Sequence, residues 1–357
     1  MKKFLLAALL VSVLVTPAIS SASETVLMVV GDICPHPSWV KREIPVPALF
    51  KGVAKTFFKA DVLIGNLETP LTACSQPTPS KAEDAVKAKR EFVFRSCRED
   101  VAPGLKDAGF TALTLANNHM LDYQEQGVLD TLTRLKSAGI LTAGAGENLE
   151  AAEKPAVIES GARKFIVISA SDVVPLNYEA SPVKPGIFSM KDEGELFSQV
   201  VAARKDYPDD VLVLMLHWGV EAAYSPTERQ KDIARNLVDA GADLIIGAHP
   251  HRVQGVEFYK GKPIFYSLGN FQFDSNPPGD ESVIAKITYK DGSNDPAEVS
   301  VIPVLIEKGG YPRILKAKEP EYSVILGRLA DQGKELGTAV SGARLSPAVT
   351  TISAYGP

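Results

Sequence analysis

The sequence predicts an α/β protein built mainly on parallel strands, and three observations support this class. Short apolar runs rich in Val, Ile and Leu recur along the chain, as expected of strands buried on both faces. Amphipathic segments with helical spacing lie between them. Asp, Asn or His follows several of these runs, and all five histidines of the 357-residue chain lie in motifs at predicted strand ends.

Seven apolar runs are the predicted strands of the sheets. They are Val26–Val30, Val62–Ile64, Ala112–Leu115, Phe165–Ser169, Val211–Leu216, Leu244–Ile246 and Ile264–Leu268. Two later β-rich runs, Val283–Tyr289 and Val299–Leu305, flank a turn sequence at 291–296 and predict a hairpin.

Helices are predicted between the strands from the spacing of apolar residues and from their end signals. One covers Gln126–Ala138 and ends at Gly139. Another covers Pro226–Ala240 and ends at Gly241, with Ser225, Pro226 and Glu228 forming a capping box at its start. After Tyr311 the pattern fades to one weakly patterned helix over Ser323–Thr338, followed by an irregular tail rich in Ser, Gly and Ala.

These patterns divide the chain into a leader, one domain and a tail. Residues 1–23 are predicted to be an export signal: two lysines precede an apolar run over 4–15, a proline follows, and small residues at 20–22 offer a cleavage site. The apolar run is short for a membrane span. We expect the domain to cover 24–310 and the tail 311–357, in a protein that is periplasmic or extracellular and soluble after cleavage.

The charge balance argues against nucleic acid as a partner. The formal net charge is −5, and it becomes −7 once Lys2 and Lys3 leave with the signal. The chain has no basic excess and no long run of one charge that would suit a polyanion.

The three cysteines leave two alternatives, because export permits oxidation. Cys74 and Cys97 flank a polar segment, and its residues 75–90 are expected to form an exposed insertion. Either all three cysteines are free thiols, or Cys74 pairs with Cys97 and pins the insertion. In the second case Cys34, which lies in the first strand-end motif, stays unpaired near the site.

The histidine motifs predict a metal site, since imidazole is a common ligand of zinc and similar ions. His249 and His251 are separated by Pro250, which stops the strand, and residues i and i+2 of a strand share a face. His217 directly follows the strand Val211–Leu216. Carboxyl ends of neighbouring parallel strands meet at one edge of a sheet, so these ligands can converge there.

Oxygen ligands follow other strands, and each has a simpler alternative. Asp32 could be a ligand or form an Asx turn, and Glu68 could bridge two metals or lie on the surface. Of Asn117 and Asn118, one could bind metal while the other caps a turn. His119 could be a ligand or a general acid beside the metals, with Asp122 orienting its imidazole.

Together these motifs are recognisable. The chain resembles the CapA family of bacterial capsule proteins, linked to poly-gamma-glutamate synthesis, which itself resembles the calcineurin-like metallophosphoesterases. The matching segments are Gly31-Asp32, Gly65-Asn66-Leu67-Glu68, Leu115–His119 with Leu121-Asp122, Gly144–Gly146, His217-Trp218-Gly219 with Glu221, Gly247–His251 and Tyr266–Phe271.

The resemblance implies a four-layer α/β/β/α sandwich with two divalent metal ions (Mn, Zn, Fe or Mg). The metal ligands would be Asp32, Glu68, Asn118, His217, His249 and His251, with His119 and Asp122 catalytic. Six further residues would line the cleft or support the ligands: His36, Asn66, Asn117, Trp218, Glu221 and Asn270. His36, held between two prolines, is expected to line the cleft without touching metal.

Two functions from different classes fit this pattern. The first is an exported hydrolase of capsule biosynthesis that uses metal-activated water on an envelope polymer such as poly-gamma-glutamate, or on a phosphoester. The second is a non-catalytic, metal-containing protein that binds the polymer or helps to assemble the capsule machinery. Membrane capsule-synthesis proteins are possible partners of either one.

Overall fold

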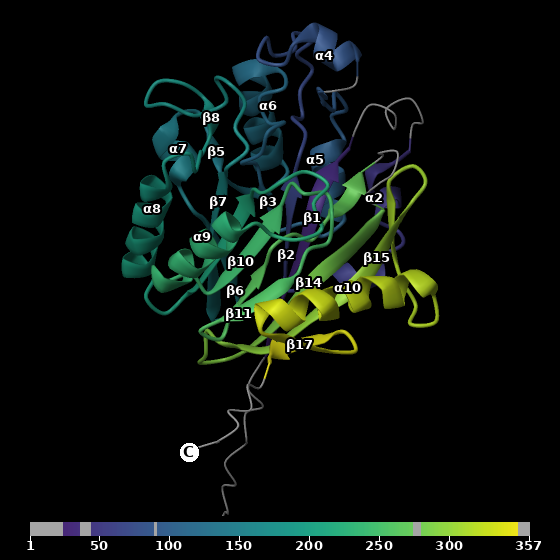
Figure 1. Ribbon diagram of the computed structural model, residues 1–357. Coiled ribbons are helices and arrows are strands. Elements are labelled where there is room, and N and C mark those ends of the chain that lie inside the picture. The colour runs from purple at the N-terminus through teal and green to yellow at the C-terminus, as the bar shows by residue number, and fades with distance from the viewer. Residues whose placement is uncertain (1–23, 36–43, 89–90, 274–279, 349–357) are drawn as a thin grey trace, which may run out of the picture.

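The computed structural model describes residues 24–35, 44–88, 91–273 and 280–348 (Figure 1). The expected signal segment and His36 therefore lie outside the described residues. Among the described residues, no helix combines the length and the apolar composition needed to cross a membrane.

The strands form a ten-stranded sheet, a six-stranded sheet and a two-stranded ribbon. The ten-stranded sheet contains β1 (Glu24–Cys34), β2 (Val62–Leu67), β3 (Ala112–Thr114), β4 (Leu141–Ala143), β13 (Asn270–Phe273), β14 (Glu281–Lys290), β15 (Pro296–Glu307), β16 (Tyr311–Ile314), β17 (Thr338–Ser341) and β18 (Arg344–Pro347). The six-stranded sheet contains β6 (Ala156–Ser160), β7 (Arg163–Ser171), β9 (Val211–His217), β10 (Leu244–Ala248), β11 (Val256–Tyr259) and β12 (Lys262–Phe265). The ribbon pairs β5 (Ala145–Gly146) with β8 (Gly186–Ile187).

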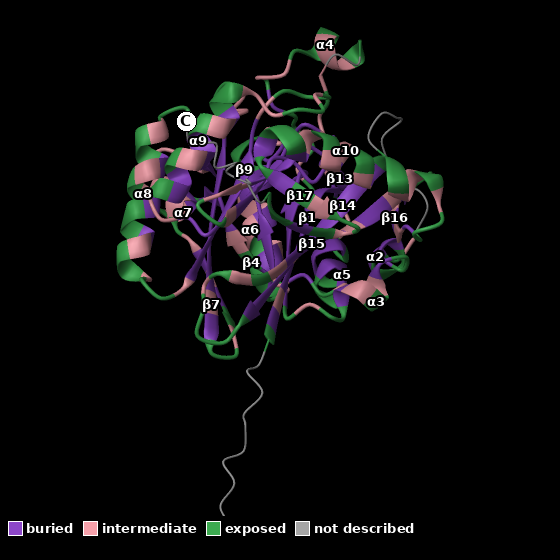
Figure 2. Cartoon of the chain, turned by 60° about the horizontal axis from the view of Figure 1, so that its bottom comes forward, coloured by how far each residue is buried: buried purple, intermediate pink, exposed green. Residues whose placement is uncertain are grey.

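The helices lie mainly on the outer faces of the two sheets. They are α2 (Val46–Leu49), α3 (Ala54–Phe57), α4 (Glu83–Lys87), α5 (Val101–Asp107), α6 (Gln124–Ser137), α7 (Leu149–Glu153), α8 (Glu193–Asp206), α9 (Glu228–Asp239) and α10 (Pro320–Leu336). In both ribbon views α4 stands apart from the sheets, at the top of the molecule (Figures 1 and 2).

The strand alternation explains why the sheets stack. In β9, Val213 faces the core shared by the two sheets, whereas its neighbours Leu212 and Leu214 face the core under α8 and α9. In β1, Leu27 and Val29 face the shared core in the same way, whereas Met28 and Val30 pack towards α2, α3 and α5. Each sheet is therefore covered on both faces, and Figure 2 shows the strands buried beneath exposed helices. The expected α/β/β/α sandwich is confirmed.

Two expectations about local structure differ from the structure. Helix α9 begins two residues later than expected, because Thr227 is the N-cap and forms the capping box with Gln230, not Ser225 with Glu228. The run Ile264–Leu268 is not one strand: β12 ends at Phe265, and β13 begins at Asn270 beside β1.

The expected C-terminal tail is also different, since residues 311–348 belong to the domain. Strand β16 pairs with β15, β18 pairs with β15, and α10 buries Ile325 and Leu329 in the core between the sheets. Helix α10 ends at Gly337, whose φ of 66° is the left-handed conformation that glycine adopts readily.

The expected Cys74–Cys97 disulfide is absent, because all three cysteines are free thiols. The half-buried Cys74 turns its sulfur towards the carbonyl oxygen of Gln76, 4.0 Å away, and Cys97 is exposed. Cys34 is fully buried at the end of β1, and burial raises the pKa of its thiol well above the usual value. A neutral buried thiol is a poor nucleophile and a poor metal ligand.

Candidate metal centre

The carboxyl ends of the two sheets meet at one place, and the histidine motifs lie there. The ten-stranded sheet brings Asp32 beside Asn66 in the register of β1 and β2, and beside Asn270 in the register of β1 and β13. The six-stranded sheet brings His217, the last residue of β9, opposite Ala248, the last residue of β10. Ligands from both sheets therefore face one another across the sandwich.

Two groups of possible metal ligands result, and they share one carboxylate. The ligand atoms of Asp32, Glu68 and His251 lie within 4.8 Å of one another, as do those of Glu68, His217 and His249. Asn118 joins the second group, since its Oδ1 lies 2.8 Å from Nε2 of His217. The six residues that the sequence predicted as ligands are therefore brought together.

Several buried oxygen and nitrogen atoms of this cluster lack a hydrogen-bond partner, and bound cations could interact with them. Both carboxylate oxygens of Glu68 are buried and have no hydrogen-bond partner, and neither has Nδ1 of the buried His249. Leaving such groups unpaired costs about 1–3 kcal/mol each, and more for a charge. Two divalent ions sharing Glu68 would satisfy these atoms, so the residues present fit a dinuclear centre.

The pKa values of the clustered side chains are strongly shifted by burial and by one another's charges. Burial, followed by repulsion from Asp32, raises the pKa of Glu68 well above its usual value. Burial lowers the pKa of His249 to about 3 and that of His217 well below its usual value, so both imidazoles keep free lone pairs. Burial also acts against the charged form of His251, but Glu68 and Asp32 outweigh it and raise its pKa to about 10.

The backbone of the His249–His251 motif differs from the strand geometry expected of it. Strand β10 ends at Ala248, and both histidines have positive φ, 94° at His249 and 54° at His251. Residues other than glycine rarely adopt a backbone conformation with positive φ, and the backbone strain that it causes is concentrated at functional sites. The two imidazoles converge through a tight turn, and not through the alternation of a strand.

Two predicted supporting residues orient ligands directly. Asn66 donates from Nδ2 to Oδ1 of Asp32 at 2.8 Å, and the same nitrogen lies 3.3 Å from Nδ1 of His217. Asn270 places its Oδ1 2.7 Å from Nδ1 of His251. Such contacts fix the direction in which a ligand presents its lone pair.

His119 lies beside this cluster and contacts Asp122, as the sequence suggested. Its Nδ1 lies 2.7 Å from Oδ2 of Asp122, and its ring packs on Phe94 with centroids 4.4 Å apart. Burial, followed by the charge of Lys81, lowers the pKa of His119 to about 4. None of the ligand groups includes His119, which favours the general-acid alternative over the ligand alternative.

Three other predicted site residues are not in the two groups of possible metal ligands. Asn117 is one contact removed from them, since its Nδ2 donates to Oδ1 of Asn66 at 3.2 Å. Asn117 ties the turn together by donating to the carbonyl of Leu67 and accepting from the His119 N–H. Trp218 is fully buried and donates from its indole to the carbonyl oxygen of Tyr266, so substrate cannot reach it. Glu221 is exposed.

The sequence missed three residues that contact the His119–Asp122 pair. Lys81 from the expected insertion, Tyr178 from the loop after β7 and the backbone N–H of Phe94 all reach Asp122. No motif marks them, since Lys81 lies in a polar stretch that is typical of a surface. The insertion is thus exposed along α4 but sends one buried lysine into the site.

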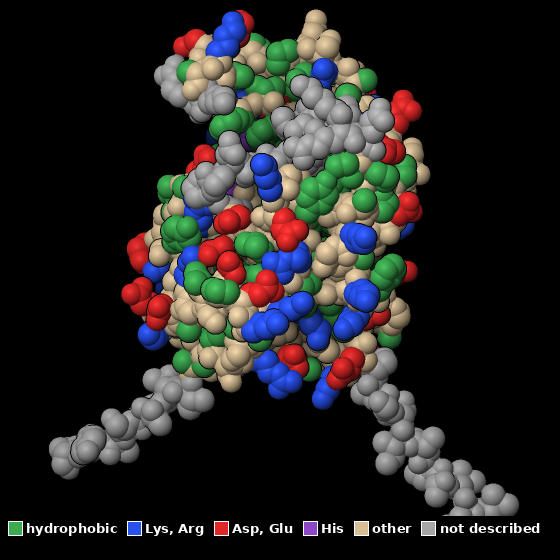
Figure 3. Space-filling view, turned by 90° about the vertical axis from the view of Figure 1, so that its right-hand side faces the viewer, with side chains coloured by type: hydrophobic (Ala, Val, Ile, Leu, Met, Phe, Trp, Pro, Cys, Tyr) green, Lys and Arg blue, Asp and Glu red, His purple; other side chains and the backbone are tan. Residues whose placement is uncertain are grey.

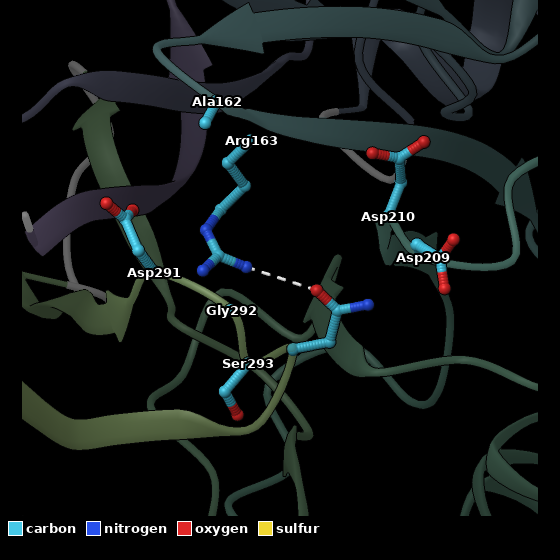
Figure 4. A pocket seen from close by; sticks show the side chains of 8 residues that line it. Ala162, Arg163, Asp209, Asp210, Asp291, Gly292 and Ser293 are labelled. Atoms are coloured by element: carbon cyan, nitrogen blue, oxygen red, sulfur yellow. Dashed lines mark hydrogen bonds between the residues drawn. The ribbon is translucent and has the colours of Figure 1, made fainter. Parts of the chain in front are cut away.

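A second hollow lies at the opposite, amino ends of β7 and β9. It is a cavity of about 370 Å³ lined by the start of β7, the loop before β9 and the β14–β15 turn. Figure 4 shows Arg163 at its centre, joined to Asn294 by a hydrogen bond, with Asp209, Asp210 and Asp291 around it. No histidine lines this cavity, so the predicted chemistry does not belong there.

The surface in Figure 3 carries acidic and basic side chains interspersed, without a field of one sign. A polyanion would therefore find no broad basic platform on this face.

The fold and the cluster define an α/β/β/α sandwich protein with a candidate dinuclear metal centre at the carboxyl ends of its strands. The family model of the bacterial capsule synthesis protein PGA_cap matches residues 26–275. The chain belongs to this family.

Curated relatives agree with this membership. The chain is 32% identical over 308 residues to the capsule biosynthesis protein CapA of Bacillus anthracis, covering 85% of this chain and 73% of that one. It is 33% identical over 264 residues to the PGA biosynthesis protein CapA of Bacillus subtilis, covering 72% and 66%. A probable polyglutamine synthesis accessory protein of Mycobacterium tuberculosis is 32% identical over 220 residues, covering 59% and 55%.

Solved structures with low sequence identity also align. A putative 5′-nucleotidase from Staphylococcus aureus gives a TM-score of 0.47 at 17% identity, with 87% of this chain and 58% of that one covered. The sulfate thiohydrolase SoxB of Thermus thermophilus gives 0.45 at 12% identity, with 87% and 60% covered. The chain therefore spans less than two thirds of these two proteins.

Proposed function

We propose that this protein is a metal-dependent hydrolase of capsule polymer synthesis, exported to the periplasm or cell exterior. The observation that carries the proposal is Glu68, which is shared by two ligand groups and keeps both carboxylate oxygens buried and unpaired. Family membership supports a role in capsule synthesis, because the relatives are named for capsule, PGA or polyglutamine synthesis.

The ligands would divide between two ions. Asp32 and His251 would hold one, His217, His249 and Asn118 would hold the other, and Glu68 would bridge them. Bound ions would supply Lewis-acid polarisation of the substrate and activation of water. Their charge would also relieve the repulsion between Glu68 and Asp32.

The remaining residues would bind and move the proton. In its doubly protonated form, His119 would donate the Nε2 proton to the leaving group as the scissile bond breaks, and water would add its hydroxyl to the other product and release its proton to solvent. Asp122 would hold the imidazole through Nδ1. Asn66 and Asn270 would keep the ligands in place.

We propose an envelope polymer such as poly-gamma-glutamate, or a phosphoester, as substrate. Either one brings anionic groups and a polar bond to the metals. Membrane proteins of capsule synthesis would be partners. A protein that holds the polymer at its metals without turnover is the outcome if hydrolysis is absent.

The test compares metal content and activity in the wild type and in a His249→Ala/His251→Ala variant. We expect about two divalent ions per chain by elemental analysis, strong loss of metal in the variant, and hydrolysis of gamma-glutamyl polymer or phosphoesters that a chelator abolishes. Equal metal in both proteins would refute the metal centre. Metal without any chelator-sensitive hydrolysis would replace the enzyme with the binding protein.

A further inference from the structure

Lys81 is buried although its surrounding segment is polar. Its side chain is 7% exposed. The Nζ atom lies 2.5 Å from Oδ1 of Asp122, and 3.0 Å from the carbonyl oxygens of both Phe92 and Asn118. An ammonium group has three protons to donate, and these three oxygens can accept all of them. Lys81 thus links the insertion, a proposed metal ligand and the partner of His119.

Asp122 is the point where these contacts converge. Its side chain is fully buried, and it accepts hydrogen bonds from the Tyr178 hydroxyl at 2.8 Å and from the Phe94 N–H at 2.6 Å. A buried carboxylate requires an opposite charge or full hydrogen bonding. Among the residues that the structure describes, Lys81 is the one lysine or arginine in ion-pair contact with Asp122.

This arrangement also fixes the proton of His119. Nδ1 of His119 lies 2.7 Å from Asp122 and 3.1 Å from Nζ of Lys81. Because the three Lys81 protons have oxygen acceptors, we assign a proton to Nδ1 that is donated to Oδ2 of Asp122. That leaves Nε2 as the ring nitrogen that can face a substrate. The ring itself rests on Phe94, which shares Asp122 as a partner.

We propose that Lys81 is a positioning residue for His119. By bridging Asp122 to the backbone carbonyl of the proposed ligand Asn118, it sets where Nε2 of His119 lies relative to the metals. The insertion that carries Lys81 then contributes a side chain that positions His119 in the site. The expected change in ester hydrolysis rests on the proposed function, whereas the expected position of the His119 ring does not.

The kinetic test compares two esters that differ in their need for an acid. Phenyl phosphate has a leaving group that must be protonated, whereas the p-nitrophenolate of p-nitrophenyl phosphate leaves readily without a proton. With metal-loaded enzyme, we expect Lys81→Met to lower kcat on phenyl phosphate by about 10²-fold, the lower end of general acid–base effects, with KM unchanged. The loss on p-nitrophenyl phosphate should be only a few-fold.

Three further variants complete the kinetic comparison. His119→Asn should show the same preference for the activated ester, and the double variant should lose little more than His119→Asn alone. Lys81→Arg should recover part of the loss. Lys87→Met is the matched control, since Lys87 lies in the same segment, is 73% exposed and pairs only with Glu83 on the helix surface. Equal losses on both esters, with unequal KM, would overturn the proposal.

A spectroscopic test separates this inference from the proposed function. In protein labelled with ¹⁵N-histidine, the Nδ1–H signal of His119, assigned with His119→Asn, should be visible in the wild type and in Lys87→Met. In Lys81→Met it should weaken or vanish through exchange with water, because Asp122 loses its ion pair and is held less firmly by the remaining hydrogen bonds from Tyr178 and Phe94. If the wild type hydrolyses neither ester, the proposed function fails, and this signal alone decides the inference. An unchanged signal in Lys81→Met would overturn it.

Discussion

The carboxyl and amino ends of β7 and β9 both carry buried polar side chains, and the two sets differ in how their atoms are paired. At the amino ends, Arg163 is nearly buried: its terminal nitrogens donate to the Lys290 carbonyl and to Asn294, its guanidinium lies 4.9 Å from the Tyr289 ring, and only its Nε lacks a hydrogen-bond partner. At the carboxyl ends, neither carboxylate oxygen of Glu68 has a hydrogen-bond partner, and its ion-pair contacts are with His217 and His251, 3.6 and 3.9 Å away.

The presence of a cavity is therefore not enough to identify a functional site. Most polar groups that line the amino-end cavity pair with one another or are exposed, and Nε of Arg163 is the buried exception. In the carboxyl-end cluster, both carboxylate oxygens of Glu68 and Nδ1 of His249 are buried without a hydrogen bond at one place, which suits bound cations. Variants at the two ends should therefore fail in different ways.

Removing the charge of Glu68 should have the largest effect. We expect Glu68→Gln to weaken metal binding by about 100-fold or more, beyond the 10–100-fold typical of outer-shell changes. The metal-free variant should be no less stable than the metal-free wild type, because the substitution removes a carboxylate that Asp32 repels. Competition with a metal chelator and thermal unfolding measure the two quantities.

The matched control for this variant is Glu221→Gln, which changes an exposed carboxylate that the sequence also assigned to the site. It should change metal affinity far less than Glu68→Gln does, because its exposed carboxylate acts on Glu68 only through its charge. If Glu68→Gln and Glu221→Gln both bind metal as the wild type does, the carboxyl-end cluster is not a metal site.

Removing an orienting group should have an intermediate effect. Asn66→Ala takes away the donor to Asp32 and the contact with His217, and we expect metal affinity to fall by about 10–100-fold. Asn117→Ala removes an amide that ties turns together and donates to Oδ1 of Asn66, so it should cost about 1–3 kcal/mol of stability and lower metal affinity less than Asn66→Ala does, because it contacts no ligand directly. The same affinity loss in both variants would show that the cluster is sensitive to any local disturbance.

Changing the amino end should have the smallest effect on metal. Arg163→Ala loses two hydrogen bonds and a stacking contact, and we expect a loss of about 1–3 kcal/mol in the free energy of unfolding. Metal content should not change. Urea unfolding and elemental analysis check both statements, and metal loss in Arg163→Ala would mean that the two ends are coupled.

Much of the fold was predictable because the signals are local. Short continuous apolar runs placed β1, β2, β7, β9 and β10, and the turn at 291–296 placed the β14–β15 hairpin, since each signal depends on neighbouring residues. The capping box of α9 was misplaced by two residues, because Ser225 and Thr227 both fit the pattern and only the helix geometry decides between them.

The ligand set of the candidate site could also be proposed from sequence, through strand-end histidines and the family resemblance. The structure brings those residues together, and metal binding itself stays a prediction. The geometric reason given for His249 and His251 was wrong, since a turn with positive φ replaces the expected strand. Convergence did not depend on that detail, because both residues directly follow β10.

The sequence was enough to predict which residues lie at the ends of the strands and which motifs carry the proposed metal ligands. Only the tertiary structure decided which other groups reach them. Lys81 and Tyr178 contact Asp122 across 41 and 56 positions of sequence, and the tail beyond Tyr311 completes a sheet whose central strand begins at Glu24. Periodicity reports which face of an element is buried, but it carries no information on which distant segment covers that face. That choice is made by packing and by the pairing of buried charge, which exist only in the folded chain.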